Sequence, residues 1–263
     1  MRRNNHLKLL TLAALTLGMA TKTSSTIVSA DDARSVTTDG SVKILQSDAP
    51  TSVLNPLNPK EKSSNVVGGQ DNTKNAGGDA LTLDYVSKFD FGQLKLDPDA
   101  AITVYAKADL WTDQNGQKVA VPNRLQVTDK RLGADAWKVS LSASDLQSEE
   151  KDSQGKVVNT VKIKDAFITL LESRVIDSRA QDVSARFGLK KAVNIYMGDG
   201  QATDILAVND KEVAKGTFIN LFNSAKAGEG VSLTVPAESY KTKGLKSGAF
   251  TSKLTWTLTS API

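Results

Sequence analysis

The sequence predicts an all-β fold, an antiparallel β-sandwich or barrel-like domain with at most short helices. Many short stretches alternate apolar and polar residues with period two. Gly, Asn and Asp turn signals separate these stretches, and no long apolar pattern of helical period interrupts them. Short strands at such regular spacing are typical of sandwiches and barrels.

The most regular strand pattern lies near the C-terminus, at residues 254–258. Leu254, Trp256 and Leu258 fall on one face, and threonines fall on the other. β-branched and aromatic side chains suit a pleated, half-buried surface. A second tryptophan strand, at 137–141, shows the same alternation. The other main strands are expected at 81–85, 101–108, 125–129, 157–163, 167–171, 193–197, 218–222 and 231–235, with one short helix near 180–187 or 224–228.

The first thirty residues read as a secretory signal peptide. A basic start precedes an apolar run from Leu9 to Ala20, and small residues stand at 28–30 before Asp31. We expect cleavage between Ala30 and Asp31, with 18–20 as an earlier alternative. The apolar run has 12 residues, whereas a membrane-spanning helix needs about 20. The protein is therefore expected to be exported and not to span a membrane.

Removal of the leader makes the charge balance neutral. The leader contains four of the 33 Lys and Arg residues and no acid, so the mature chain has 29 bases and 29 acids. A nucleic-acid-binding surface is expected to show an excess or a cluster of basic residues. We therefore expect no nucleic-acid partner.

The mature chain contains no cysteine, and its one histidine, His6, leaves with the leader. This composition excludes Ser-His-Asp triads, cysteine nucleophiles and metal sites built on imidazole or thiolate. We expect no cofactor and no metal. Export without disulfides fits a bacterial surface.

Residues 31–79 are poor in aromatic residues and rich in Ser, Thr, Asn, Asp, Gly and Pro. Such a stretch buries too little apolar surface to fold alone, and its Pro and Gly residues break regular structure. The predicted organisation is a signal peptide at 1–30, a flexible polar linker at 31–79 and an all-β domain at 80–263.

Three groups of motifs follow one another along the chain. Leu81-Thr82-Leu83 leads to Phe89-Asp90-Phe91-Gly92, and Val127-Thr128-Asp129-Lys130-Arg131 leads to Trp137. Val231-x-Leu233-x-Val235-Pro236 and Tyr240 precede Leu254-Thr255-Trp256-Thr257-Leu258. In this order the motifs resemble the WxL-domain family of Gram-positive surface proteins. One residue departs from the family pattern: the first tryptophan motif reads Trp137-Lys138-Val139, with valine in place of leucine.

The resemblance implies a non-enzymatic adhesion module that attaches non-covalently to the cell wall, with peptidoglycan or another wall polymer as its partner. It also implies assembly with other surface proteins, including membrane-anchored ones. The alternative function is a subunit of a surface complex or adhesin in which protein–protein contacts dominate. The candidate wall-contact residues are Trp137, Trp256, Leu258, Asp129, Lys130 and Arg131.

Each of these candidates also has a structural interpretation. An indole can stack on a sugar ring, but a tryptophan on an apolar strand face is more often buried in the core. Arg131 can bind carboxylates through its planar fork, whereas a neighbouring acid and base more often form a local ion pair.

Other chemistry has weaker support. Asp113-x-Asn115-Gly116 and Asp199-Gly200 with Asp204 carry oxygen ligands for calcium, but neither has the full loop spacing. The loops 198–200 and 228–230 lack the rest of a phosphate-binding fingerprint and read as turns. Carboxylates, Lys, Tyr and hydroxyl groups remain for catalysis, and paired acids such as Glu149, Glu150, Glu172 and Asp177 could serve a hydrolase.

Overall fold

The computed structural model describes residues 40–47, 51–61, 66–67, 80–113, 115–133, 136–209, 214–223 and 225–261. The chain divides into two units, 1–43 and 44–263, and every strand described lies in the second. The described residues form antiparallel sheets and two short 3-10 helices, with no α-helix among them. The all-β prediction is confirmed.

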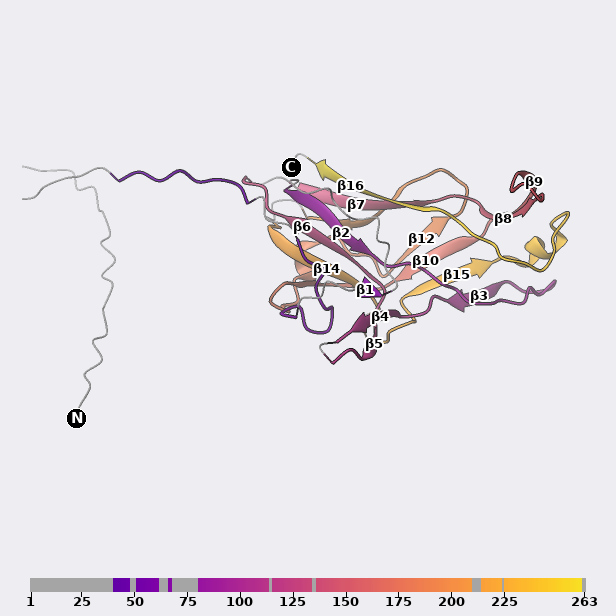
Figure 1. The fold of residues 1–263 in the computed structure, drawn as a ribbon, viewed down its shortest axis with the longest axis horizontal. Helices are drawn as coiled ribbons and strands as arrows, with labels where there is room; N and C mark the ends of the chain where they lie inside the picture. Colours follow the sequence, from indigo (N-terminus) through magenta and orange to yellow (C-terminus); the bar gives the residue numbers. More distant parts are fainter. Residues whose placement is uncertain are drawn as a thin grey trace, which may run out of the picture. The chain divides into compact units, whose positions relative to one another are not determined.

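One four-stranded sheet has the order β11-β14-β6-β2 (Figure 1). Its central strand β6 is buried along its whole length, so both faces of the sheet must be covered. The register of β14 on β6 runs from Gly216 opposite Asp129 to Leu221 opposite Arg124. The bounds are β2 Leu81–Val86, β6 Arg124–Asp129, β11 Ser173–Asp177 and β14 Gly216–Phe222.

A second four-stranded sheet has the order β12-β10-β15-β3. Burial alternates along β10 and β12, which places Ile168, Leu170, Val193 and Ile195 on the covered face. The bounds are β3 Ile102–Tyr105, β10 Phe167–Leu171, β12 Ala192–Tyr196 and β15 Val231–Val235.

The third sheet, β13-β7-β16, joins the two tryptophan strands. β16 pairs with β7 along its full length, from Leu254 opposite Ala143 to Ala261 opposite Ala136. Among the described strands β16 pairs only with β7, so it forms an edge of the sheet. The bounds are β7 Ala136–Ala143, β13 Thr203–Ala207 and β16 Leu254–Ala261.

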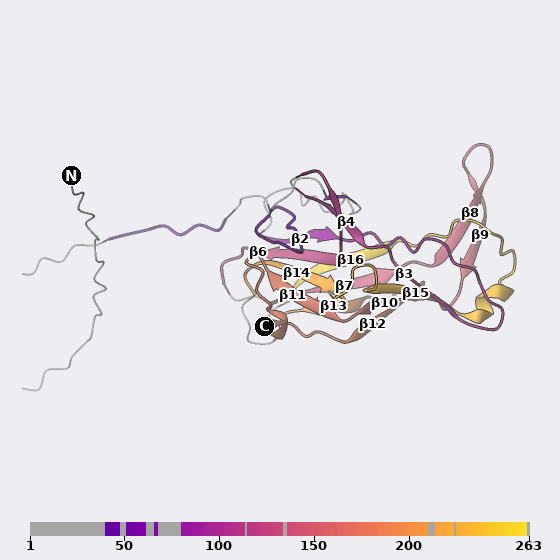
Figure 2. The ribbon, with the colours of Figure 1, turned by 90° about the horizontal axis from the view of Figure 1, so that it is seen from below.

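Two smaller sheets complete the fold. β1 (Val66–Val67), β4 (Asp109–Thr112) and β5 (Lys118–Val121) form one of them. The other is a hairpin of β8 (Leu146–Lys151) and β9 (Val157–Ile163). This hairpin projects beyond the other strands, and the short helix η3 (Ala237–Lys241) lies at the same end (Figures 1 and 2). The other short helix, η2 (Ser184–Arg186), lies within the expected range 180–187.

The three larger sheets share one hydrophobic core. Trp137, Val139 and Leu141 of β7 meet Leu125 and Val127 of β6 within it. Because all three sheets contribute their apolar faces to the same cluster, each depends on the others for burial. β12 and β15 supply Val193, Ile195, Val231, Leu233 and Val235.

Residues 51–61 lie against the sheet of β6, although the sequence assigns them to the flexible linker. The Gln126 side chain accepts a hydrogen bond from the Leu54 amide at 2.8 Å and donates one to the Ser52 carbonyl at 2.9 Å. The buried Asp84 carboxylate accepts from Thr51 at 2.7 Å and from Gln126 at 2.9 Å. The sequence did not predict this contact, because residues 51–61 are polar and their partners are buried polar side chains of the sheet.

The same segment also buries one apolar side chain. Leu54 packs with Ile176, Ile219 and Leu221 in a small cluster of its own. Ile219 alternates along β14 with core residues, so it projects from the face opposite the main core. Residues 51–61 therefore cover the outer face of the sheet at this point. The rest of the linker prediction falls largely outside the described residues.

The geometry of the 228–230 loop explains why positions 228 and 230 are both glycine. Gly228 has φ of +83°, a conformation that favours glycine. A side chain on Gly230 would collide with the Phe222 carbonyl, so β14 and the start of β15 approach each other too closely for any other residue.

Candidate functional site

The candidate residues predicted from the sequence lie on or directly after three strands, β6, β7 and β16. The end of β6, the start of β7 and the end of β16 meet at one corner of the domain, and Trp256 and Leu258 lie further back along β16. Asp129 ends β6, and Lys130 and Arg131 follow it directly. Trp137 begins β7, while β16 supplies the other two candidates, Trp256 and Leu258. Ser260 lies opposite Trp137, so the end of β16 returns to the start of β7 (Figure 1).

Trp137 lies in the core. It is 1% exposed and packs against Phe187 and Phe218, with ring centroids 5.6 and 6.1 Å away. Its indole N–H donates to the Ala214 carbonyl at 3.3 Å, which satisfies the one polar atom of the side chain. With this burial Trp137 presents no face to a ligand, and its contribution is to packing.

Trp256 and Leu258 are half-buried because of their position on an edge strand. Trp256 lies opposite Leu141 and Leu258 opposite Val139, and opposed residues of an antiparallel pair share a face. Both side chains therefore point toward the core. No further described strand pairs with β16 on its other side, so that edge of the strand is unpaired.

Trp256 lies at one end of a row of three aromatic rings. Phe89 meets the indole edge-on, with centroids 6.2 Å apart and planes at 71°. Phe91 follows at 6.3 Å from Phe89, and both phenylalanines are half-buried against the core. The Phe89-Asp90-Phe91-Gly92 motif thus positions two aromatic rings next to the C-terminal tryptophan strand, a contact that the sequence motif alone does not show.

Asp129 and Arg131 form a two-point ion pair. The Arg131 Nε donates to Oδ1 at 3.0 Å and its Nη2 donates to Oδ2 at 2.9 Å. Lys215 adds a third contact to Oδ2 at 3.2 Å. The remaining Arg131 nitrogen, Nη1, donates to the Ser260 hydroxyl at 2.5 Å. The pair therefore links the end of β6 to the end of β16.

The Asp129 carboxylate is inaccessible to solvent, with a side-chain exposure of 0%. Burial raises its pKa, but hydrogen bonds from Arg131 and Lys215 outweigh burial and hold the pKa below its ordinary value. Asp129 therefore stays charged and keeps Arg131 in place. Arg131, with a side-chain exposure of 15%, and the half-buried Lys130 are the cationic members of the corner.

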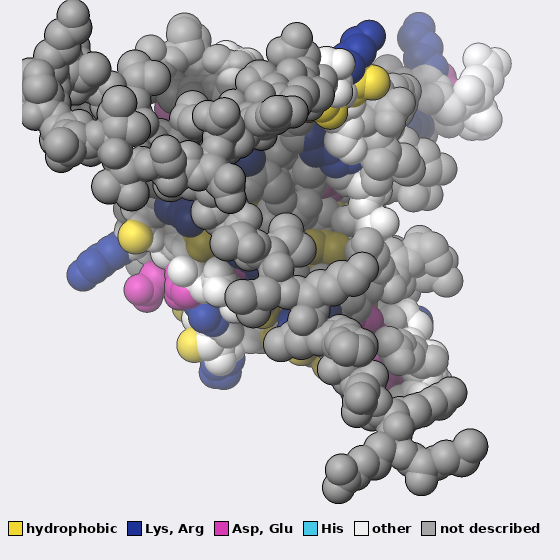
Figure 3. Space-filling view, turned by 90° about the vertical axis from the view of Figure 1, so that its left-hand side faces the viewer, with side chains coloured by type: hydrophobic (Ala, Val, Ile, Leu, Met, Phe, Trp, Pro, Cys, Tyr) yellow, Lys and Arg dark blue, Asp and Glu magenta, His cyan; other side chains and the backbone are white. Residues whose placement is uncertain are grey.

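The side of the domain that faces left in Figure 1 mixes charge with apolar surface. Where described side chains are visible on it, basic, acidic and hydrophobic residues all appear (Figure 3).

The sequence did not indicate Ser260 or Lys215, because their roles depend on contacts that no local pattern predicts.

The loops considered for calcium use their carboxylates within the chain. Asp113 Oδ1 accepts from the amides of Asn115 and Gln117 at 2.9 and 2.8 Å. Asp199 Oδ1 accepts from the Gln201 amide at 2.8 Å. Both are turns stabilised by an aspartate side chain. No group of three or more His, Cys, Asp or Glu side chains that could hold a metal occurs among the described residues.

The four acids considered for hydrolysis do not form one site. Glu149 and Glu150 lie on the projecting hairpin, where they pair with Lys151 at 3.8 Å and Lys246 at 2.8 Å. Asp177 ends β11 in another sheet and pairs with Arg179 at 2.8 Å, and Glu172 directly precedes that strand.

The family model of the WxL domain, described as surface cell wall-binding, matches residues 31–262. The chain belongs to the WxL-domain family. This family binds the cell wall and is not an enzyme family. Comparison with the curated proteins and with the solved structures found no match.

The WxL match begins at residue 31, well before the predicted domain start at 80. It therefore includes residues 51–61, which pack on the β6 sheet of the WxL domain. In the described part of the chain no helix is long and apolar enough to cross a membrane.

Proposed function

We propose that this WxL protein is exported and attaches non-covalently to peptidoglycan at the surface of a Gram-positive cell. The family description supports binding to the cell wall. The family match begins at Asp31, which is also the first residue after the predicted cleavage site. This coincidence supports a leader that is removed before the domain acts.

The proposed contact surface is the end of β16, and Trp256, which is half-buried and not enclosed in the core, is the observation that carries it. An indole on an edge strand offers a flat apolar face that a sugar ring can cover. Phe89 fixes the orientation of the indole. Arg131, held by Asp129 and Ser260, keeps a positive charge at this corner, and a positive charge attracts carboxylate groups.

The buried candidates act indirectly in this proposal. Trp137 fills the core beneath β7, and Asp129 orients Arg131. Leu258 packs beside Trp256 on the same face. The accessible contacts are then Trp256, Lys130 and Arg131.

The test is retention of the purified 31–263 chain on washed peptidoglycan. Trp256→Ala is expected to weaken binding about tenfold, because one ring contact is lost. Tyr105→Ala is the matched control, since Tyr105 is an exposed aromatic residue on a different sheet. Thermal unfolding of both variants separates loss of contact from loss of fold.

Equal binding by Trp256→Ala and the unmodified chain would remove this surface from the proposal. Absence of any binding by the unmodified chain would refute direct attachment to peptidoglycan.

A second candidate function is supported by the edge position of β16. An unpaired strand edge can accept a strand from another chain. In that case the protein would be a subunit of a surface complex or adhesin, held by another surface protein. Retention on walls only when that protein is present would favour this function.

A further inference from the structure

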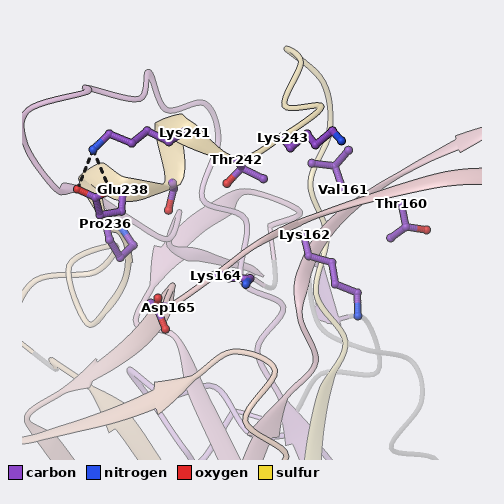
Figure 4. A pocket seen from close by; sticks show the side chains of 11 residues that line it. Thr160, Val161, Lys162, Lys164, Asp165, Pro236, Glu238, Lys241, Thr242 and Lys243 are labelled. Atoms are coloured by element: carbon purple, nitrogen blue, oxygen red, sulfur yellow. Dashed lines mark hydrogen bonds and ion pairs between the residues drawn. The ribbon is translucent and has the colours of Figure 1, made fainter.

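A pocket lies at the projecting end of the domain. It is lined by β9, by the turn from β9 to β10, and by η3 with the residues after it. Its volume is about 530 Å³, within the range of small-ligand sites. The β9 end and the η3 segment lie far apart in sequence but form two walls of one hollow (Figure 4).

The lining of the pocket is basic. Four lysines, at 162, 164, 241 and 243, face two acids, Asp165 and Glu238. Two of these lysines already form ion pairs with acids: Lys241 with Glu238 at 3.0 Å, and Lys162 with Asp145 at 2.6 Å. In Figure 4 the Lys241 side chain turns back onto Glu238.

The other two lysines have no such partner. Lys164 comes from the β9–β10 turn and Lys243 from the segment after η3. Both are exposed, and neither makes an ion pair with a described residue. Two ammonium groups on different walls of one hollow attract an anion that fits between them.

A buried hydroxyl adds a second, independent observation. Ser239 lines the pocket and is only 4% exposed. Its Oγ has no hydrogen-bond partner in the described structure. A buried hydroxyl without a partner is unfavourable, and an oxyanion in the pocket would accept a hydrogen bond from it. Thr160 and Thr242 bring further hydroxyls to the same lining.

We propose that this pocket binds a phosphate group of a phosphodiester-linked polyanion. Lysine is a compact point charge that suits phosphate, whereas arginine, with its planar fork, suits carboxylate. The pocket is lined by lysines and hydroxyls and by no arginine. It is separate from the β16 corner, so it adds a second ligand to the proposed attachment to peptidoglycan.

The test measures binding of a short poly(glycerol phosphate) by calorimetry at low ionic strength. Lys164→Gln with Lys243→Gln is expected to weaken binding about tenfold, since each ammonium near a polyanion contributes modestly. Ser239→Ala is expected to weaken it by a smaller factor. Lys190→Gln with Lys191→Gln is the matched control, because it removes the same charge from two exposed lysines outside the pocket.

Two comparison ligands define the specificity. Poly-glutamate of equal charge tests carboxylate, and phosphatidylglycerol vesicles test a lipid source of the same phosphodiester. Preference for either over poly(glycerol phosphate) would overturn the proposal, as would absence of binding or an equal loss in the control variant. Retention on purified peptidoglycan, measured in parallel, reports on the β16 corner and is expected to be unchanged in the pocket variants.

Discussion

At the scale of single residues, Arg131 joins the end of β6 to the end of β16, the last strand. Its guanidinium binds the buried Asp129 carboxylate through two nitrogens and the Ser260 hydroxyl through a third. The Asp-Lys-Arg trio and the final strand are far apart in sequence, yet one side chain joins them. Asp129 and Arg131 therefore have a structural role in addition to the proposed contact with a ligand.

Replacing Arg131 with alanine is expected to lower the free energy of unfolding by about 1–3 kcal/mol, because a buried carboxylate loses its main partner. Hydrogen exchange should speed up at the Ser260 end of β16 more than at its Leu254 end. Lys138→Ala is the control: its ion pair with Asp204 is exposed on both sides and is expected to contribute under about 1 kcal/mol. Similar exchange along β16 in both variants would contradict this role.

Another residue shows what sequence patterns could not indicate. Arg124 is fully buried, pairs with Asp109 at 3.1 Å and lies 4.4 Å from the Tyr85 ring centroid. Asp109 also accepts hydrogen bonds from Tyr85 at 2.9 Å and Ser87 at 2.5 Å. A single arginine at the start of a strand looks like a surface residue, and only the tertiary arrangement of these partners makes its burial possible.

At the scale of elements, residues 51–61 are held against β6 by side-chain contacts. Gln126 satisfies backbone groups of Ser52 and Leu54, as a neighbouring strand otherwise would. Thr51 also donates to Asp84, and Leu54 packs in its small apolar cluster. The attachment therefore has a polar part, centred on Gln126, and an apolar part at Leu54.

Gln126→Leu is expected to lower the free energy of unfolding by about 1–3 kcal/mol, since it leaves backbone groups and Asp84 short of partners. Limited proteolysis within 51–61 should become faster than elsewhere in the domain. Gln147→Leu makes the same chemical change on the projecting hairpin, where the side chain bonds only the exposed Glu149, and should leave the cleavage rate unchanged. Unaltered cleavage in Gln126→Leu would show that Leu54 packing alone holds the segment.

The strands whose predicted ranges match the structure best are those in which apolar residues recur at alternate positions. The predicted ranges 157–163, 167–171 and 231–235 coincide with β9, β10 and β15. β8 was missed because its charged residues project into solvent and carry no apolar alternation. For the candidate site, the sequence could not show that Trp137 is buried in the core and Trp256 only half-buried, because burial depends on the strands that pack around them.

At the scale of the whole molecule, several paired carboxylates make stability depend on pH. Hydrogen bonds from Ser184 and Arg174 lower the pKa of Asp182 from 3.8 to about 2. The pKa of Asp129 is also below its ordinary value. A depressed folded-state pKa gives stability that is present above the unfolded value and is lost as the pH falls through the folded one.

Urea unfolding should therefore show the free energy of unfolding falling between about pH 5 and pH 2. In Asp182→Asn this fall should be shallower, because one of the titrating groups is gone. Arg174→Gln, which removes one partner of the same carboxylate, should also make the fall shallower. An unchanged slope in both variants would show that Asp182 does not contribute to acid stability.

The pairing of β16 with β7 determines when the domain can be completed. β7 can form this pairing only after residues 254–261 have been synthesised, and they form the last strand described. Until then, the strand that holds Trp137 and Leu141 has one open edge. Closure of the domain is thus expected to be a late step in the folding of the chain.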